Sequence, residues 1–313
     1  MKSELTSAEY ENILLNIYPR LNQFTHRGGG EGEVYFIDDD YVVKVYNSKL
    51  SLEETIAFEQ YVAENNSFNS LGFCIPKIYA WIALPQTKGN KIVVLQERAK
   101  GKPLYLDEII EENYGLCSDF CSKQEFKKAL ANQEGALYTK IVQTFIGEFI
   151  KANQQLEALP DSEVENFIIS DYGLLSGAQH CQTDIQAPNV MLADNKFTVI
   201  DNIFVAEDVE RWTDEYNRAH VLKDIFVMFS DSDPFSDMYM HLGAKGLPAV
   251  SRLINKNKRV CGAALTKFVK KANQLLAPKI TSQDDYDICE AATFDIISEN
   301  DAKNILQQID FEM

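Results

Sequence analysis

The sequence lacks any long apolar run and any excess of positive charge. Of its 313 residues, 30 are Lys or Arg and 47 are Asp or Glu, so the formal net charge is −17. Proteins that bind nucleic acid need clustered cations to displace counterions from the phosphate backbone, and this balance argues against such a partner. An acidic surface instead favours basic partners or solubility. No stretch approaches the roughly 20 apolar residues of a membrane-spanning helix, so we expect no membrane span.

The sequence also has few cysteines and no apparent export signal. Residues 1–10 lack the basic start and apolar run of a secretory signal. The six cysteines are scattered, and we expect reduced thiols in a cytoplasmic protein. Cys117 and Cys121 lie one helical turn apart, but no second Cys pair or His pair at ligand spacing accompanies them. We interpret them as ordinary thiols.

The first third of the chain alternates between strand and helix patterns. Apolar residues at intervals of three and four predict a helix over residues 3–24. Ser51 followed by Glu54 is a capping-box signature that predicts a helix from there to about Asn65. Strands are predicted over Val34–Ile37, Tyr41–Tyr46, Lys77–Leu84 and Lys91–Gln96. The order hairpin, helix, hairpin predicts a small antiparallel sheet that carries one helix, in an α+β protein.

After Gly101 the pattern becomes helical. Residues 136–158 carry an amphipathic stripe, and helices return from Tyr216 to the end. Between them, two short apolar strands, Val190–Leu192 and Phe197–Ile200, flank an Asp194-Asn195 turn. A charged segment over residues 107–135 has no role that the sequence assigns.

A run of glycines, Gly28, Gly29, Gly30 and Gly32, lies between a predicted helix and a predicted strand. Rossmann and Walker glycines lead into a helix instead, so this context disfavours both. The run fits a hairpin flap, where backbone N–H groups approach phosphate oxygens because no side chain intervenes.

Lys44 lies in an apolar strand, where a buried cation needs an anionic partner. Three carboxylates, of Glu54, Glu59 and Glu64, are available on the following helix. We favour Glu59, because Ile56, Glu59 and Val62 share one helix face that would aim it at the sheet; Glu54 is the alternative.

Three oxygen-bearing side chains, Asp184, Asn189 and Asp201, follow at spacings of five and twelve residues. An Asp in a loop can orient and deprotonate a hydroxyl group. Asn189 and Asp201, brought together by the intervening hairpin, offer two hard oxygen ligands for Mg²⁺.

In this order, the segments resemble the protein-kinase-like fold. RGGGEGEVY at 27–35 is similar to the family's glycine-rich loop, with Arg27 in place of its first Gly, while Gly29, Gly32 and Val34 fit. VVKVY at 42–46 resembles the strand of the nucleotide-binding Lys, Asp184 to Asn189 the catalytic loop, and VIDN at 199–202 the metal-binding strand. Residues 93–101 resemble the hinge strand, with Gln96 as gatekeeper and Glu97 and Ala99 where the backbone would contact adenine.

The resemblance implies ATP- and Mg²⁺-dependent phosphoryl transfer in a bilobal protein. In it, Lys44 would hold the α and β phosphates, Glu59 would hold Lys44, Asp184 would orient the acceptor hydroxyl, and Asn189 with Asp201 would bind the metal. Residues 1–26 would be a helical extension, 27–99 the small lobe and 100–313 the larger, mostly helical lobe with a divergent C-terminal part. The compact glycine hairpin and the short run from Val34 to Lys44 most resemble bacterial secreted effector Ser/Thr kinases. Our leading hypothesis is therefore a Ser/Thr protein kinase of this type, which implies a protein substrate, a host cytosol and room for a host activator.

Three departures leave other functions open. Gln182-Thr183-Asp184 stands for HRD, so the Arg that senses a phosphorylated activation loop is absent. Gln186 replaces the Lys usual in Ser/Thr protein kinases, and no APE motif follows. A small-molecule or lipid-headgroup kinase of the aminoglycoside or choline phosphotransferase type, acting on a small hydroxyl-bearing substrate, is therefore the alternative. A non-catalytic pseudokinase that binds partners is the third hypothesis.

Overall fold

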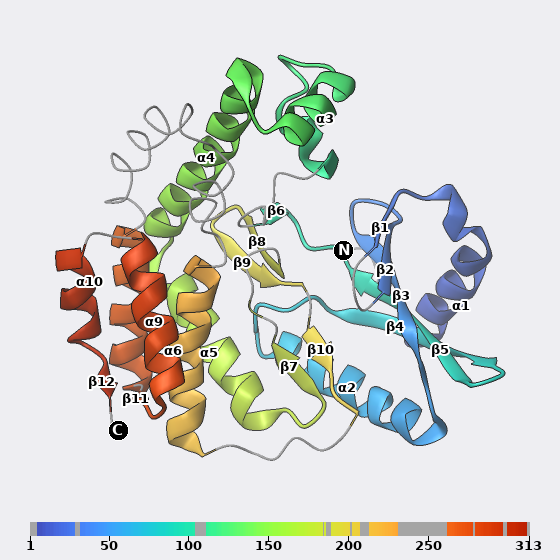
Figure 1. Cartoon of the computed structure of the whole chain (residues 1–313). Coiled ribbons are helices and arrows are strands. Elements are labelled where there is room, and N and C mark those ends of the chain that lie inside the picture. The colour runs from blue at the N-terminus through green and yellow to red at the C-terminus, as the bar shows by residue number, and fades with distance from the viewer. Residues whose placement is uncertain are drawn as a thin grey trace. The chain divides into compact units, whose positions relative to one another are not determined.

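The protein is described from a computed structural model (Figure 1). It describes residues 5–28, 32–103, 111–183, 185, 189–200, 202–206, 213–230, 262–277, 279–296 and 299–311. The chain divides into two compact units. One, here the sheet unit, comprises Met1–Lys100, Ile169–Asp184 and Thr198–Arg211, and the other, the helical unit, comprises Gly101–Ile168, Ile185–Phe197 and Trp212–Met313. No helix within the described ranges is long and apolar enough to cross a membrane.

The sheet unit is built on five antiparallel strands in the order β1-β2-β3-β5-β4. Their bounds are β1 His26–Gly28, β2 Gly32–Phe36, β3 Tyr41–Leu50, β4 Ile78–Gln86 and β5 Gly89–Glu97. Four of these were predicted, each with slightly different ends. The short strand β1 was not, because its His-Arg-Gly sequence carries no apolar alternation.

Two helices cover opposite faces of this sheet. Side chains alternate between the two faces along each strand. One face, with Val43, Val45 and Leu95, packs against Tyr10 and Leu14 of α1 (Ser7–Ile17). The helix predicted over residues 3–24 is shorter than expected, since Pro19 lies at the start of a 3-10 turn, η1 (Tyr18–Gln23).

The other face packs against α2 (Leu52–Ser70), and later parts of the chain complete the core there. Leu50, Ile92 and Val94 lie together with Phe58 and Tyr61 of α2. Further core residues come from the end of α5 (Asp161–Gly177) and the position directly after it, from β7 (Cys181–Thr183) and from β10 (Asn202–Phe204): Leu174, Ala178, Cys181 and Phe204. The sheet unit is therefore completed by residues that lie 104 to 134 positions beyond the end of α2.

The capping box that predicted α2 is present. The Ser51 hydroxyl accepts from the Glu54 N–H, and the Glu54 carboxylate accepts from the Ser51 N–H at 2.6 Å. The helix runs to Ser70, five residues beyond the predicted end, because Asn65, Asn66 and Asn69 bind the backbone of the segment that returns to β4.

The helical unit contains α3 (Lys123–Asn132), α4 (Gly135–Ala158), α6 (Asp214–Ser230), a helix over 262–276, α9 (Gln283–Ile296) and α10 (Glu299–Leu306). Its shorter elements are η2 (Glu111–Leu116) and the paired strands β11 (Lys279–Ile280) and β12 (Asp310–Phe311). The rings of Phe167, Phe197, Phe229 and Phe268 form a cluster, with neighbouring centroids 5.0–5.9 Å apart. The charged segment at 107–135 thus includes α3, which opens with its own capping box.

A three-stranded sheet, in the order β6-β8-β9, contains the predicted hairpin. Its strands are β6 (Lys102–Pro103), β8 (Val190–Ala193) and β9 (Lys196–Val199). The turn residues Asp194 and Asn195 have φ values of 49° and 60°, a conformation that these two residue types tolerate. Gly101 has φ +94° and lies so close to the Leu192 carbonyl that no side chain would fit. The structure thus confirms the expected α+β class, with an antiparallel-sheet N-terminal region and a helical C-terminal region.

Candidate active site

Lys44 is buried in the middle of the sheet, as its sequence predicts. Only 7% of the residue is exposed. It pairs with Val34 on β2 and Val94 on β5, and directly opposed residues share one face of a sheet. Its ammonium group lies 4.9 Å from the centre of the Tyr46 ring on the same strand. Lys44 and Val34 therefore lie side by side on the face that carries α2.

The glycine run is described only at its two ends. Gly29 and Gly30 lie outside the described residues. Gly32 begins β2, where a side chain would collide with the carbonyl oxygen of Val45 on β3. Packing against β3 therefore requires glycine at position 32, which the sequence could not show. The predicted approach of the backbone to phosphate is a separate reason for glycine there.

The helix face chosen for Glu59 is wrong. Ile56 is 54% exposed and Glu59 is exposed. The face that packs on the sheet carries Ala57, Phe58 and Tyr61 instead. This shift of one position turns Glu59 away from the core. Val62, the third residue of the chosen face, packs at the edge of the core, so it is Ile56 and Glu59 that are exposed. Aromatic burial at Phe58 and Tyr61 decided the orientation, because these side chains remove far more apolar area from water than Ile56 would.

The other carboxylates of α2 are bound elsewhere. Glu54, the alternative partner for Lys44, closes the capping box, and its hydrogen bonds from Ser51 lower the pKa of its carboxyl group. Glu64 accepts three backbone N–H groups, from Gln179 at 3.0 Å, His180 at 2.9 Å and Cys181 at 3.1 Å. Sequence reasoning named Glu64 only as an available carboxylate and did not foresee these bonds, since the loop that it binds is 115 residues away.

Two short antiparallel strands, β7 and β10, lead to the two predicted aspartates. Thr183 pairs with Asn202, and Cys181 pairs with Phe204. Asp184 follows Thr183 and Asp201 precedes Asn202 in the sequence; both aspartates lie outside the described residues. The neighbours of the two aspartates are therefore paired with each other.

Side chains of α2 and α5 fix these neighbours. The Tyr61 hydroxyl donates to the Asn202 carbonyl at 3.2 Å, and the Asn202 amide donates to the Asn65 side chain at 3.2 Å. The Thr183 hydroxyl donates to the buried carboxylate of Asp171 at 2.8 Å. Asp171 was not singled out from the sequence, where it is one of several acidic residues in a helical segment.

Asn189 is half-buried and directly precedes β8, at the start of the predicted hairpin. His180 is a buried loop residue whose Nδ1 lies 2.9 Å from the Val205 carbonyl oxygen. Because a carbonyl only accepts, this nitrogen carries the proton. His180 thus ties the segment before β7 to the segment after β10.

The segment that resembles a hinge begins where β5 ends. The N–H group of Glu97 donates to the Lys77 carbonyl at 2.8 Å, and the Glu97 carboxylate accepts from the Lys77 N–H at 3.1 Å. Glu97 is exposed and Ala99 is half-exposed. A backbone contact of Glu97 with adenine would therefore use its carbonyl group rather than its N–H group.

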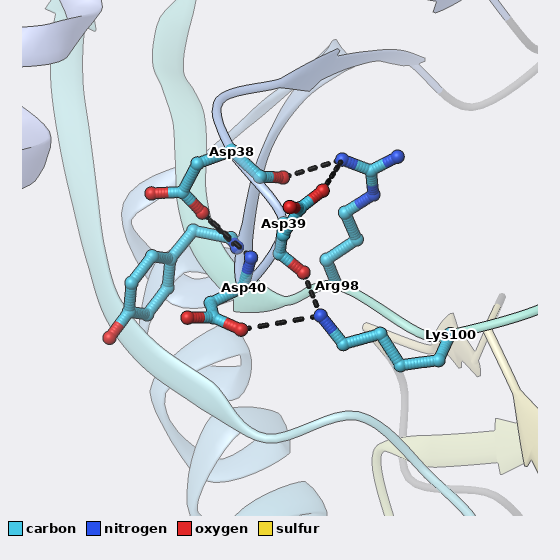
Figure 2. A network of polar contacts seen from close by, with 6 residues as sticks. Asp38, Asp39, Asp40, Arg98 and Lys100 are labelled. Carbon is cyan, nitrogen blue, oxygen red and sulfur yellow. Dashed lines mark hydrogen bonds and ion pairs between the residues drawn. The ribbon is translucent and has the colours of Figure 1, made fainter.

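An acidic turn, Asp38–Asp40, holds the residues on either side of Ala99 (Figure 2). Arg98 donates from its backbone to the Asp40 carbonyl at 2.9 Å and from its guanidinium to the Asp38 carbonyl at 2.6 Å. Lys100 contacts the Asp39 carbonyl and lies 3.2 Å from the Asp40 carboxylate. The Asp39 side chain is 99% exposed, so its 3.6 Å ion pair with Arg98 contributes little to stability. The hydrogen bonds to backbone carbonyls therefore fix this segment more than the ion pair does.

Comparison of the sequence with protein-family models and with curated proteins finds no match. Among solved structures, the chain is similar to the streptomycin–ATP ternary complex of APH(2")-IIa, with 16% identity over 88% of this chain and 98% of that one, at a TM-score of 0.26. It is also similar to an aminoglycoside phosphotransferase from Alicyclobacillus acidocaldarius (12% identity, 91% and 86% of the chains, TM-score 0.28). A third is the choline kinase LicA from Streptococcus pneumoniae (12% identity, 91% and 99% of the chains, TM-score 0.26).

Proposed function

We propose that this chain is an ATP- and Mg²⁺-dependent phosphotransferase. The observation that carries the proposal is the pairing of Thr183 with Asn202. Thr183 directly precedes Asp184 in the sequence and Asn202 directly follows Asp201, and these two described neighbours are partners in one strand pair. The described neighbours of two aspartates that are sixteen residues apart in the sequence are thereby held together at one end of one strand pair.

The roles follow from the chemistry of each group. Lys44 supplies a buried positive charge for the α and β phosphates. Asp184 accepts the proton of the acceptor hydroxyl and orients it. Asn189 and Asp201 can each bind a metal ion through a side-chain oxygen atom, and Mg²⁺ prefers oxygen ligands. The bound ion would neutralise charge on the phosphates. The flap from Gly29 to Val34 and the backbone at Glu97 and Ala99 would contact the rest of the nucleotide.

The acceptor that we propose is a small hydroxyl-bearing molecule, preferably a cationic one. A net charge of −17 attracts cations, and neither Gln186 nor the missing APE motif suits a protein substrate. A Ser/Thr protein kinase of the bacterial effector type is the second candidate, favoured by the compact glycine hairpin. A host activator and a host cytosol belong to that second candidate only.

The test begins with nucleotide binding. We expect ATP to raise the melting temperature of the wild-type protein, and to do so more with Mg²⁺ than without it. Lys44→Met should weaken ATP binding by about 10- to 100-fold, the value of one charge-assisted hydrogen bond. Asp184→Asn should keep the ATP shift and lose turnover, since its role lies with the acceptor. Equal loss of ATP affinity in both variants would contradict this division of roles.

The acceptor is tested by incubation with γ-labelled ATP and two panels. One contains hydroxyl-bearing small molecules, including aminoglycosides and choline, and the other contains generic basic proteins. Label on small molecules alone supports the first candidate, and label on proteins alone supports the second. Binding of ATP with no transfer in either panel, and no difference between wild type and Asp201→Asn, would indicate a pseudokinase.

A further inference from the structure

We infer that Glu64 is a positioning residue for the catalytic strand pair, so that α2 acts through the backbone of β7 and β10. The inference rests on the proposed function. It adds a residue whose contacts are with backbone groups near Asp184, rather than with nucleotide or with Lys44. Glu59, the carboxylate expected to connect α2 to Lys44, is exposed, whereas Glu64 faces the strand pair.

Glu64 accepts hydrogen bonds from three backbone N–H groups. Three consecutive N–H groups, of residues 179, 180 and 181, converge on its two carboxylate oxygens at 2.9–3.1 Å. Hydrogen bonds to an ionised acceptor are about twice as strong as neutral ones. No neutral side chain can replace this acceptor fully, because an amide offers only one oxygen and turns N–H donors toward the others. The start of β7 is therefore held by one carboxylate.

The same helix also holds β10. Glu64 and Asn65 follow Tyr61 at helical spacings of three and four, so all three residues lie on one side of α2. Tyr61 packs in the apolar core, and its hydroxyl group also donates a hydrogen bond to the Asn202 carbonyl. The side-chain oxygen of Asn65 accepts a hydrogen bond from the Asn202 side-chain amide. Tyr61 is 2% exposed and Asn65 is fully buried. One helix face thus binds both strands that adjoin the two aspartates.

The bound residues are close to Asp184 along the chain. Cys181, whose N–H group Glu64 binds, lies three residues before Asp184 in the sequence, and Thr183, directly before Asp184, is the last residue of β7. A displacement of 1 Å in a reacting group can cost about 100-fold in rate, while binding of a remote part of the substrate is unaffected. Loss of the Glu64 anchor should therefore lower kcat and leave the KM for ATP nearly unchanged.

The experiment compares Glu64→Gln with Glu53→Gln. Both changes remove one negative charge from α2, but Glu53 is exposed in its first turn and contacts neither strand. The probe is γ-labelled ATP with Mg²⁺ and water as acceptor, so that no acceptor needs to be known. We expect Glu64→Gln to lower kcat at least about tenfold, with the KM for ATP and the ATP-dependent melting shift within about twofold of wild type. Glu53→Gln should match wild type.

A second readout follows the anchor itself. Amide hydrogen exchange at residues 179–181 should become faster in Glu64→Gln and stay unchanged in Glu53→Gln. Where Glu64→Gln fails to fold, Tyr61→Phe, which removes the hydroxyl group that donates to the Asn202 carbonyl, takes its place and should lower kcat less strongly with the same unchanged KM. An unchanged kcat in a folded Glu64→Gln protein would overturn this inference but not the proposed function. A KM for ATP that rises by the same factor as kcat falls would do the same. A wild-type protein that neither binds nor hydrolyses ATP would instead overturn the proposed function, and this inference with it.

Discussion

At the scale of single residues, burial decides which polar side chains can carry chemistry. Lys44 is 7% exposed, and a cation in such a place is costly unless anionic groups or hydrogen bonds compensate. The pairing of Lys44 with Val34 and Val94 on the neighbouring strands places its side chain on the same face of the sheet as theirs. Glu59 shows the opposite case, since an exposed carboxylate gains little from any ion pair.

Gly32 lies against the backbone of β3, and this close contact predicts a loss of stability when a side chain is added. A Cβ at this position would collide with the Val45 backbone, which cannot move without disturbing β3. We expect Gly32→Ala to lower the free energy of unfolding by about 1–3 kcal/mol, as overpacking does. Gly28→Ala is the matched control, because nothing lies within 4 Å of a Cβ there. Urea denaturation of both variants measures the difference, and equal stability would contradict the packing role.

At the scale of the elements, α2 has two functions that different residues serve. Its N-terminus is fixed by the capping box of Ser51 and Glu54, and its inner face binds the returning chain and the strand pair. The helix has almost no continuous apolar stripe, since Asn65, Asn66 and Asn69 hold backbone groups where apolar residues would otherwise pack. The polar contacts therefore orient the helix as much as its aromatic residues do.

The capping box gives a pH dependence with a definite sign. The hydrogen bonds from Ser51 lower the pKa of Glu54 in the folded protein, so this box stabilises above the unfolded-state pKa. That stability is lost as pH falls through the lower, folded-state pKa, in the window below about pH 4.5. We expect wild type to be more stable than Glu54→Gln at pH 7, and the difference to shrink between about pH 5 and pH 3.

Urea denaturation at four pH values across this window measures the effect. Glu53→Gln removes the same charge from the same helical turn and controls for the general interaction with the helix dipole. Parallel pH profiles for the two variants would show that the capping box contributes nothing specific.

At the scale of the whole molecule, charge is the dominant property. A net charge of −17 causes self-repulsion that opposes the compact state, and salt screens it. We expect the melting temperature to rise by about 2–5 °C between about 0.02 and 0.2 M NaCl, where the Debye length falls from about 20 Å to below 10 Å. Differential scanning calorimetry at constant pH measures this shift. A fall in melting temperature would show that attractive surface ion pairs outweigh the repulsion.

Much of the fold could be predicted from local signals. The Ser51 capping box, the apolar strands at 41–46 and 91–96, the amphipathic helix at 136–158 and the Asp194-Asn195 turn all appear as expected. Each depends on residues close in sequence. The ends of α1 and α2 differ because Pro19 and the asparagines of α2 act through turns and through contacts that periodicity does not contain.

The candidate site could be predicted in part. Burial of Lys44 followed from its apolar strand, and it is confirmed. The roles of Asp184, Asp201, Asn189, Gly29 and Gly30 remain predictions. The side of α2 that faces the sheet was predicted wrongly at Glu59, because two faces of this helix carry apolar residues and only packing against the sheet selects one.

The amino-acid sequence alone determined the class of the protein, the position of its strands and helices, and the residues that the proposed chemistry needs, since propensity, capping and apolar alternation act over a few residues. Only the tertiary structure decided that segments 169–184 and 198–211 join the N-terminal sheet, and that Glu64 rather than Glu59 turns inward. These outcomes depend on contacts between residues more than 100 positions apart. Such contacts form by competition among all the surfaces that the chain can bury, and no local pattern records the result.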